Sequence, residues 1–384
     1  SKVCKSLIPI DFLSLDLRPA WGLTFSILSI CCVLRFHIMT SSSFFEGTGI
    51  NKFAQKVFSL ASKIGVTRVS EITSYDDPFV YVYQSCRPSA LHLTIDSGKG
   101  YDRNQAFISC CVEAIERFSA ENVCNDIHYM SLTELLPDVQ RMLLLNSVDY
   151  RLPCLTCHAL LDDEDRSIYI PEELIKYNSG MSARATLLLY RPGTTGLGSH
   201  SSLIPACYSG LIELLERDAI NSSFEKFLVD IDSLPNCFDR HIKWIRNRYE
   251  SFSIFYHFSP HPVHTFSIEC NDPYLYGGLN GMGASYTLMS ALDQALVESI
   301  QTSVLRISAS RDDWIFASPP FGLRKFLNQA PVLPWNSLSS LFSEVYGTDF
   351  SSHLKTIKQY CKTRNFNVYY CKLYPGIDSA PIVT

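Results

Sequence analysis

The chain of 384 residues carries 33 Lys and Arg against 38 Asp and Glu, and 46 % of its residues are hydrophobic. This length and apolar content suit one large domain, or two or three small ones, with a substantial core. The formal net charge of −5 provides no basic surface, so we expect no nucleic-acid partner. The 14 cysteines are irregularly spaced, which is not typical of a secreted disulfide scaffold, and we expect most of them to be reduced and buried in a cytoplasmic protein.

Residues 1–44 are interpreted as an N-terminal extension outside the core. Residues 19–34 carry no charge and follow Lys2 and Lys5, a pattern shared with signal peptides. The uncharged stretch is short for a membrane span, and no small-residue cleavage site follows it cleanly. A packed helix and a membrane or targeting segment are the alternatives. Met39 opens a Thr-Ser-Ser-Ser run and is an alternative start of the chain.

After the extension, helix and strand patterns alternate in one compact domain over 45–384, with no low-complexity linker. Apolar spacing predicts helices, runs of β-branched and aromatic residues predict strands, and Pro171 marks a helix start. The predicted elements are, in chain order, a helix over 49–61, strands over 79–83, 91–95 and 167–170, a helix from 172, a strand over 185–190, a hairpin over 252–256 and 263–268, and a last strand over 366–373.

A motif of serine, glutamates and arginine is repeated among these elements. The pattern Ser-x-x-x-Glu-x-x-Glu-Arg occurs twice with an offset of 100 residues, and a degraded third copy follows. Each copy trails a Gly-x-Gly that predicts a turn, at 98–100, 196–198 and 281–283. This internal repeat favours pseudo-symmetric units of strands, glycine turn and acidic helix. The motif residues are Ser109, Glu113, Glu116 and Arg117, then Ser209, Glu213, Glu216 and Arg217, then Gln294, Glu298 and Gln301.

On a helix, positions i, i+4 and i+7 share one face, so each copy presents its polar groups as a stripe. For a single copy, a solvated face with an ion pair is the ordinary interpretation. The surrounding residues are apolar nearly all round, which indicates burial instead. Buried carboxylates need arginines or metal ions, and Glu113, Glu116, Glu213 and Glu216 on facing helices would repel one another without cations. Mg²⁺ suits such oxygen ligands, with phosphates completing its shell.

Three other motifs have ordinary structural interpretations. Cys154-x-x-Cys157-His158 matches a c-type haem attachment string or half of a zinc site, yet no second Cys-x-x-Cys exists and the segment alternates like a strand. Lys99 lies between two glycines without a P-loop string, so a turn is expected, although beside ATP it could reach a phosphate or the substrate. Arg311 closes the third helix, either in a capped turn or toward nucleotide phosphates.

Together these motifs resemble the YcaO family, and within it the branch associated with TfuA proteins. The resemblance covers about residues 55 to 384, and the doubled Glu-x-x-Glu-Arg is quite specific. The matching stretches are 65–69, 86–90, 97–100, 113–117, 195–198, 213–219, 281–284, Glu298 with Gln301, and 310–313.

The resemblance implies an α+β fold of repeated strand, glycine-turn and acidic-helix units around one ATP and Mg²⁺ site without a P-loop. Little covalent protein chemistry is needed, so no Ser-His-Asp set is expected and the catalytic residues stay unassigned. The implied metal ligands are Glu113, Glu116, Glu213 and Glu216. The implied ATP-binding residues are Lys99, Ser109, Glu116, Ser201, Arg217, Glu298, Gln301 and Arg311.

The resemblance also implies the reaction and its partners. Family members activate a backbone amide of a peptide or protein with ATP, and a nucleophile then displaces the activated oxygen. A Cys, Ser or Thr side chain as nucleophile gives an azoline, with a leader-peptide-binding partner. A sulfur donor gives a thioamide, with a TfuA-like partner. A homodimer is a further expectation.

The chain departs from the family pattern at several positions. Ser201 stands where an Asn is usual, Ile204-Pro205 where an acidic pair is common, and Ser303 where an Arg is frequent. Relatives continue beyond Thr384, so the C-terminus is interpreted as truncated. These departures favour, as the alternative function, a non-catalytic accessory factor, for example in methylthiolation of ribosomal protein S12.

Overall fold

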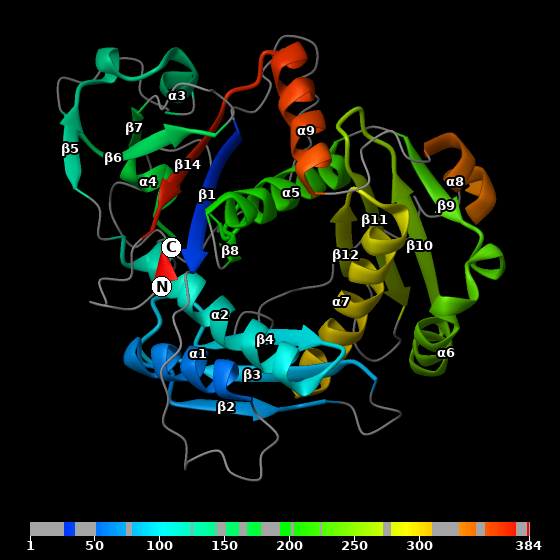
Figure 1. Ribbon diagram of the computed structural model, residues 1–384. Helices are drawn as coiled ribbons and strands as arrows, with labels where there is room; N and C mark the ends of the chain where they lie inside the picture. The colour runs from blue at the N-terminus through cyan, green and yellow to red at the C-terminus, as the bar shows by residue number, and fades with distance from the viewer. Residues whose placement is uncertain are drawn as a thin grey trace, which may run out of the picture.

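The structure of the chain is a computed structural model in which helices and strands surround a common centre (Figure 1). It describes residues 27–34, 51–73, 79–123, 126–141, 143, 151–160, 167–177, 193–200, 203–222, 225–271, 278–308, 330–342, 350–373 and 382–383. Over these ranges we find no helix with the length and apolar character needed to cross a membrane.

The helices are α1 (Lys52–Lys63), α2 (Arg103–Glu121), α3 (Pro137–Arg141), α4 (Glu172–Ile175), α5 (Leu203–Asn221), α6 (Asp239–Arg248), α7 (Leu288–Ser308), α8 (Trp335–Phe342) and α9 (Phe350–Arg364). The strands are β1 (Ile27–Leu34), β2 (Arg68–Glu71), β3 (Tyr81–Cys86), β4 (Ile95–Gly100), β5 (Ile127–Met130), β6 (Leu152–Ala159), β7 (Ser167–Pro171), β8 (Ser199–His200), β9 (Lys226–Val229), β10 (Ser251–His257), β11 (His264–Asn271), β12 (Gly278–Ser285), β13 (Val332–Leu333), β14 (Val368–Lys372) and β15 (Ile382–Val383).

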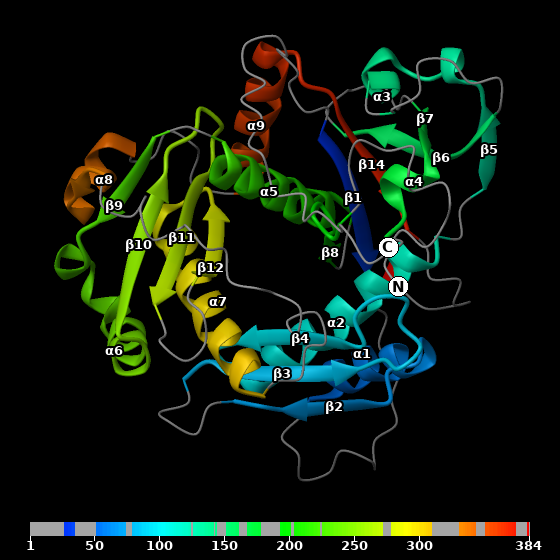
Figure 2. The same cartoon turned by 180° about the vertical axis from the view of Figure 1, so that it is seen from behind.

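These strands form three sheets, and each sheet supports one long helix. A seven-stranded sheet runs β15-β1-β14-β6-β5, with β7 beside β6 and β8 beside β1. A five-stranded sheet runs β12-β11-β10-β9-β13, and a three-stranded sheet runs β2-β3-β4. Helix α2 packs on β4, α5 on β1 and β8, and α7 on β12 and β11. Figures 1 and 2 show these three helices around the middle of the molecule, each lying against its sheet.

Three glycines bring the backbone of a strand onto the backbone of its helix. In each case a Cβ atom at the glycine would lie within 3 Å of a helix backbone nitrogen that comes 12 residues later. No side chain fits there, which explains why glycine recurs, and the shared spacing shows that the three positions are equivalent. The pairs are Gly98 with Cys110 at 2.0 Å, Gly198 with Gly210 at 2.8 Å, and Gly283 with Ala295 at 2.4 Å.

This equivalence defines three repeated units, which we call the first (β4 and α2), the second (β8 and α5) and the third (β12 and α7). The units close into a ring, because each strand also contacts the helix of another unit: β4 contacts α7, β8 contacts α2, and β12 contacts α5. Each strand therefore lies between two of the three acidic helices. This is the arrangement of repeated units around one centre that the sequence predicts.

Two of the predicted glycine turns are strands in the structure. Gly98 and Gly100 lie inside β4, and Gly281 and Gly283 lie inside β12. The sequence pattern was wrong here because glycine in these strands serves close packing rather than chain reversal. At Gly196 the prediction of a turn is correct, since this residue has a φ of +92°, in the left-handed region that favours glycine.

Two segments with alternative interpretations in the sequence lie in the seven-stranded sheet. Cys154 and Cys157 lie on β6 with both side chains buried, which confirms the predicted strand. Strand β1, from the predicted N-terminal extension, pairs with β14 and β8 in parallel and with β15 in antiparallel orientation. The domain boundary at residue 45 stays a prediction, and the predicted strand over 185–190 lies outside the described residues.

Candidate functional site

A cavity of about 1240 Å³ lies where the three units meet. Part of its lining is apolar and comes from α1 and α2, with Phe53, Val57, Ile108 and Val112. The polar part combines acidic, basic and neutral hydrogen-bonding groups from all three units. The polar residues of the lining include Ser97, Lys99, Ser109, Glu113, Glu116, Arg117, Ser199, His200, Glu213, Arg217, Glu298 and Gln301.

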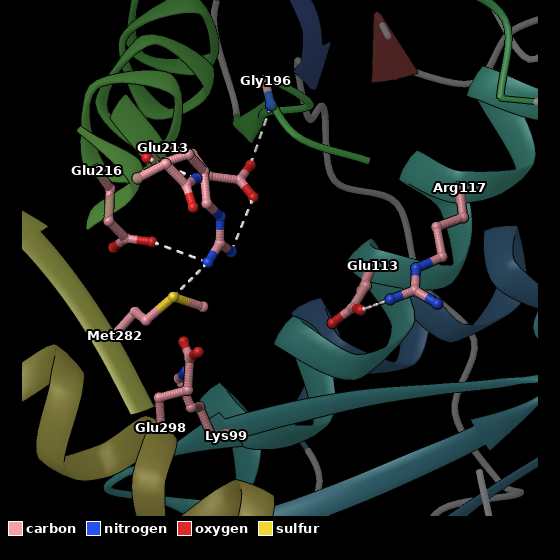
Figure 3. Close-up of polar contacts among 10 residues, drawn as sticks. Lys99, Glu113, Arg117, Gly196, Glu213, Glu216, Met282 and Glu298 are labelled. Carbon is pink, nitrogen blue, oxygen red and sulfur yellow. Dashed lines mark hydrogen bonds and ion pairs between the residues drawn. The ribbon is translucent and has the colours of Figure 1, made fainter. Parts of the chain in front are cut away.

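In the first unit, the arginine of the motif is anchored in the cavity wall. Arg117 Nη2 donates to Glu113 Oε1 at 2.6 Å, and Arg117 Nε lies 3.3 Å from Asp96 Oδ1. The Arg117 side chain is only 10 % exposed, and that of Asp96 is fully buried. Burial raises the pKa of Asp96 to about 7, an effect that the charge of Arg117 opposes. Figure 3 shows Glu113 projecting from α2 toward the middle of the site.

In the second unit, the equivalent arginine is more exposed and shares its charge between two glutamates. Arg217 Nη2 lies 3.3 Å from Glu213 Oε1, and Nη1 lies 3.5 Å from Glu216 Oε1. The Gly196 backbone N–H donates to Glu213 Oε2 at 3.2 Å. Arg217 also contacts Met282 Sδ of the third unit, a contact that a dashed line marks in Figure 3. The Arg217 side chain is 32 % exposed. This guanidinium can therefore turn into the cavity without leaving a fully buried charge behind.

The third unit contributes through contacts with the first. Lys99 Nζ lies 3.0 Å from Glu298 Oε2, and both side chains remain partly exposed (Figure 3). Gln301 Nε2 donates to Ser97 Oγ at 3.0 Å in a buried contact. These pairs join β4 to α7 across about 200 residues of sequence. They bring the predicted residues Lys99, Glu298 and Gln301 to the same cavity as the motifs on α2 and α5.

Burial shifts the acidity of the glutamates around this cavity. It raises the pKa of Glu116 to about 8, although Ser199 Oγ donates to Glu116 Oε2 at 2.7 Å. Burial likewise raises the pKa of Glu216 to about 8 despite the nearby charge of Arg217, and it raises that of Glu213. Glu116 and Glu216 therefore have too little positive charge nearby to ionise fully at neutral pH. A bound cation would supply that charge and lower both pKa values.

Glu113, Glu116 and Glu213 line the cavity and Glu216 contacts Arg217 of its lining, yet the four glutamates do not form a preassembled metal centre. Glu113 is held by Arg117, while Glu213 and Glu216 are held by Arg217. Among the described residues, no three His, Cys, Asp or Glu side chains lie close enough together to hold a metal ion. Glu113 and Glu213 are neutralised by arginines four residues later on the same helix rather than by metal ions, as the helical spacing allows. Of the residues predicted to bind ATP, Ser201 and Arg311 lie outside the described residues.

The sequence analysis missed three side chains that complete these contacts, namely Asp96, Ser199 and Met282. The signal that could have found them is the 100-residue offset of the repeat, applied to the strands as well as the helices. Counting from the equivalent glycines, Ser199 matches Lys99, and Asp96 stands where the other units have glycine. Met282 has no polar signature and is identified only by its contact with Arg217.

The residues present fit Mg²⁺ and a polyphosphate in their chemistry. Carboxylate oxygens are ligands that Mg²⁺ accepts, and it usually adds substrate phosphates to its shell. The raised pKa values of Glu116 and Glu216 indicate that the positive charge near these buried carboxyls is too small to keep them fully ionised at neutral pH. The partly exposed side chains of Arg217 and Lys99 are cations suited to phosphate oxygens.

Solved structures share this fold. YcaO from Methanopyrus kandleri bound with AMPPCP and Mg²⁺ is 16 % identical, with a TM-score of 0.62 over 86 % of this chain and 87 % of that one. A heterocyclase in complex with substrate and cofactor is 16 % identical, with a TM-score of 0.64 over 91 % of this chain and 54 % of that one. The E. coli microcin synthetase McbBCD complex with pro-MccB17 bound matches at 17 % identity, with a TM-score of 0.59 over 82 % of this chain and 85 % of that one. The fold is therefore the one found in YcaO proteins and heterocyclases.

The chain itself belongs to the YcaO family. Residues 97–383, about three quarters of its length, match the family described as YcaO cyclodehydratase, ATP- and Mg²⁺-binding. The resemblance stated from the motifs is thereby confirmed, and ATP and Mg²⁺ are the cofactors of this family.

Curated relatives match parts of the chain. An uncharacterized protein of Methanothermobacter thermautotrophicus is 34 % identical over 164 residues, 41 % of this chain and 42 % of the relative. An uncharacterized protein of Mycobacterium tuberculosis is 23 % identical over 261 residues, 65 % of this chain and 59 % of the relative. An uncharacterized protein in the tfuA 3′ region of Rhizobium leguminosarum bv. trifolii is 28 % identical over 163 residues, 40 % of this chain and 38 % of the relative. The chain thus spans between 38 % and 59 % of the length of these relatives.

Proposed function

We propose that this chain is an ATP- and Mg²⁺-dependent enzyme that activates a backbone amide of a peptide or protein. The observation that carries the proposal is the convergence of glutamates from α2, α5 and α7 on one cavity of about 1240 Å³. Burial raises the pKa to about 8 at Glu116 in the cavity lining and at Glu216 next to Arg217, which supports binding of a cation there. Membership of an ATP- and Mg²⁺-binding family supports the same conclusion.

In this proposal the site residues divide into metal ligands and nucleotide ligands. Glu113, Glu116, Glu213 and Glu216 hold Mg²⁺ when it is bound. The residues that contact ATP are Lys99, Ser109, Glu116, Arg217, Glu298 and Gln301, together with Ser201 and Arg311 from outside the described residues. Ligand binding would then break two sets of ion pairs, those of Arg217 with its glutamates and that of Lys99 with Glu298. The carboxylates would bind Mg²⁺, and the two basic side chains would bind phosphate oxygens.

The chemistry requires positioning and electrostatics rather than a protein nucleophile. Bound ATP and Mg²⁺ supply a phosphoryl group that turns the amide oxygen into a leaving group, with its negative charge neutralised. The chain contributes Arg217 and Lys99 to orient the phosphates and the carboxylates to fix the cation. The apolar residues Phe53, Val57 and Ile108 form an apolar part of the cavity wall.

The product and the partner are proposed as one of two pairs. A relative in a tfuA 3′ region supports a TfuA-like partner and a thioamide product. The fold shared with heterocyclases supports an azoline and a leader-peptide-binding partner. A homodimer and a cytoplasmic location are further parts of the proposal.

Calorimetric titration with ATP tests the proposal directly. We expect binding in the presence of Mg²⁺ and loss of binding in EDTA, and equal affinity in both would contradict a metal-bridged site. We expect Glu216→Gln to abolish Mg²⁺-dependent binding. Glu269→Gln is the matched control, because Glu269 pairs with Lys226 on the five-stranded sheet, away from the cavity lining.

Incubation with ATP, candidate peptides and a sulfide source distinguishes the products by mass. An azoline has lost one water, whereas a thioamide has exchanged one oxygen for sulfur. The second candidate function, an accessory factor, is favoured by Ile204-Pro205 at the start of α5, where an acidic pair is common in the family. An accessory factor would bind its partner with no turnover of ATP under any of these conditions.

A further inference from the structure

The contact between Asp96 and Arg117 distinguishes the first unit from the other two. Asp96 lies on β4, two residues before the glycine that packs on α2, and its side chain is fully buried. The equivalent positions of the second and third units are Gly196 and Gly281, so neither has a carboxylate there. In the second unit the backbone N–H of Gly196 instead donates to Glu213.

Arg117 contacts carboxylates on two sides, through a hydrogen bond with Glu113 and through an ion pair with Asp96 that is not a hydrogen bond. Its Nε lies 3.3 Å from Asp96, and its Nη2 donates to Glu113 at 2.6 Å. The third nitrogen, Nη1, is buried and makes no hydrogen bond within the described structure. The positive charge of Arg117 is therefore divided between Asp96 and Glu113, and any change at Asp96 alters how strongly Glu113 is held.

The other charges near Asp96 neutralise each other. Arg87 and Glu121 form a buried pair at 2.7 Å, with both side chains 1 % exposed. Both influence Asp96, in opposite directions, as do Arg117 and Glu113. With Arg87 engaged by Glu121, Arg117 is the cation in direct contact with Asp96. Asp96 is not among the described residues that line the cavity, so it reaches the site through Arg117.

We propose that Asp96 is a positioning residue, which anchors Arg117 in the cavity wall and so leaves Glu113 available to a divalent cation. This inference rests on the proposed function, in which Glu113 binds Mg²⁺. Without the charge of Asp96, Arg117 places its whole charge on Glu113 and competes with the cation. The second unit needs no such anchor, because Arg217 is shared by Glu213 and Glu216.

Asp96→Asn tests the inference, because it removes the charge and keeps the shape. The measurement is the Mg²⁺ concentration that gives half-maximal ATP binding, at pH 8 where Asp96 is ionised in the wild type. We expect that concentration to rise about tenfold, while ATP affinity at saturating Mg²⁺ stays within about twofold. Glu269→Gln is the control: it removes a carboxylate that pairs with Lys226 at 2.8 Å, away from the cavity lining, so it should leave the Mg²⁺ requirement unchanged.

A second measurement reports on Arg117 without nucleotide. An arginine-specific dicarbonyl reagent, read out by mass spectrometry, should label Arg217 faster than Arg117 in the wild type, in line with side-chain exposures of 32 % and 10 %. We expect Asp96→Asn to increase labelling of Arg117 several-fold and to leave Arg217 unchanged. If Asp96→Asn does not fold, Asp96→Gly, the residue of the other two units, takes its place.

The inference requires both results. An unchanged Mg²⁺ requirement, or continued protection of Arg117, would overturn it. If the wild type shows no Mg²⁺-dependent ATP binding, the proposed function fails and the cation half of this inference fails with it. The labelling of Arg117 still decides separately whether Asp96 anchors that side chain.

Discussion

The two full copies of the motif have the same residue types but hold their arginines differently. Arg117 is 10 % exposed and is fixed between Glu113 and a buried aspartate, whereas Arg217 is 32 % exposed and reaches Met282 of another unit. The difference begins outside the motif, two residues before the shared glycine, where the first unit has Asp96 and the second has Gly196. A repeated motif therefore does not imply a repeated role, because the strand beneath the helix decides how free its arginine is.

The largest expected effect comes from replacing the glycine that the two units share, where the strand backbone packs on the helix backbone. At Gly98 any side chain would collide with the backbone of α2, since a Cβ would lie 2.0 Å from the Cys110 nitrogen. We expect Gly98→Ala to cost on the order of 4 kcal/mol of stability or to prevent folding. Gly198→Ala should behave similarly, as its Cβ would lie 2.3 Å from the Ala206 oxygen. Gly193→Ala is the control, because the nearest heavy atom to its Cβ lies at 3.9 Å. Urea denaturation measures all three, and a mild effect at Gly98 would contradict the assigned equivalence.

The next test separates the two arginines. Arg117→Gln leaves the fully buried Asp96 without its cation, and we expect a stability loss of about 3 kcal/mol. Arg217→Gln removes a partly exposed group, so we expect less than about 1 kcal/mol of destabilisation together with loss of ATP binding. Chemical denaturation and calorimetric titration of both variants check this. Equal destabilisation by the two substitutions would mean that Arg117 and Arg217 contribute equally to stability, contrary to this comparison.

A smaller effect is expected from the acidity of the second unit. Burial holds the pKa of Glu216 near 8, so the folded state retains a proton that the unfolded chain releases above about pH 4.5. Stability from this group is present at low pH and is lost as the pH rises toward 8. The buried histidines with lowered pKa values change the stability only below about pH 6.5, so they do not contribute to its change between pH 6.5 and 8.

We therefore expect Glu216→Gln to reduce the fall in unfolding free energy between pH 6.5 and 8, by on the order of 1 kcal/mol per pH unit. Asp96→Asn is the comparison from the first unit. Because the pKa of Asp96 is about 7, this substitution should change the pH dependence of the unfolding free energy mainly below pH 7. Denaturation curves at several pH values without Mg²⁺ or ATP measure this. A slope identical to that of the wild type would show that Glu216 is ionised in the folded protein.

The smallest effect is expected at the predicted domain boundary. If residues 1–44 lie outside the core, a chain that begins at Met39 melts and binds ATP as the full chain does. Strand β1 makes this a sharp test, because its pairing with β14 and β8 would be lost from the sheet beside the second unit. A melting temperature several degrees lower would move the boundary to a point before β1.

Much of the site follows from the sequence because its signals are local. The spacing of Glu113, Glu116, Glu213 and Glu216 among apolar neighbours predicts buried acidic helices, and all four approach the same region of the structure. Helix α1 and strands β7, β10 and β14 also lie close to their predicted ranges. Periodicity and turn chemistry are properties of short windows, so they are readable without the fold.

The remaining features depend on pairings between distant parts of the chain. The contact between Lys99 and Glu298 joins residues 199 positions apart, and that between Ser199 and Glu116 joins residues 83 positions apart. No local pattern predicts which partner a partly buried side chain will find. The glycines of β4 and β12 were interpreted as turns for the same reason, since their role is set by the helix that packs on them.

The closed order of the three units has a consequence for the dynamics of the protein. No unit contains the cavity alone, so any local opening that separates one unit from its neighbours also dismantles the site. A ligand that contacts all three units stabilises the closed arrangement, because it binds the closed form and not the opened forms. Amide protons in β4, β8 and β12, which belong to three different sheets or sheet edges, should then slow their exchange together when ATP and Mg²⁺ are added.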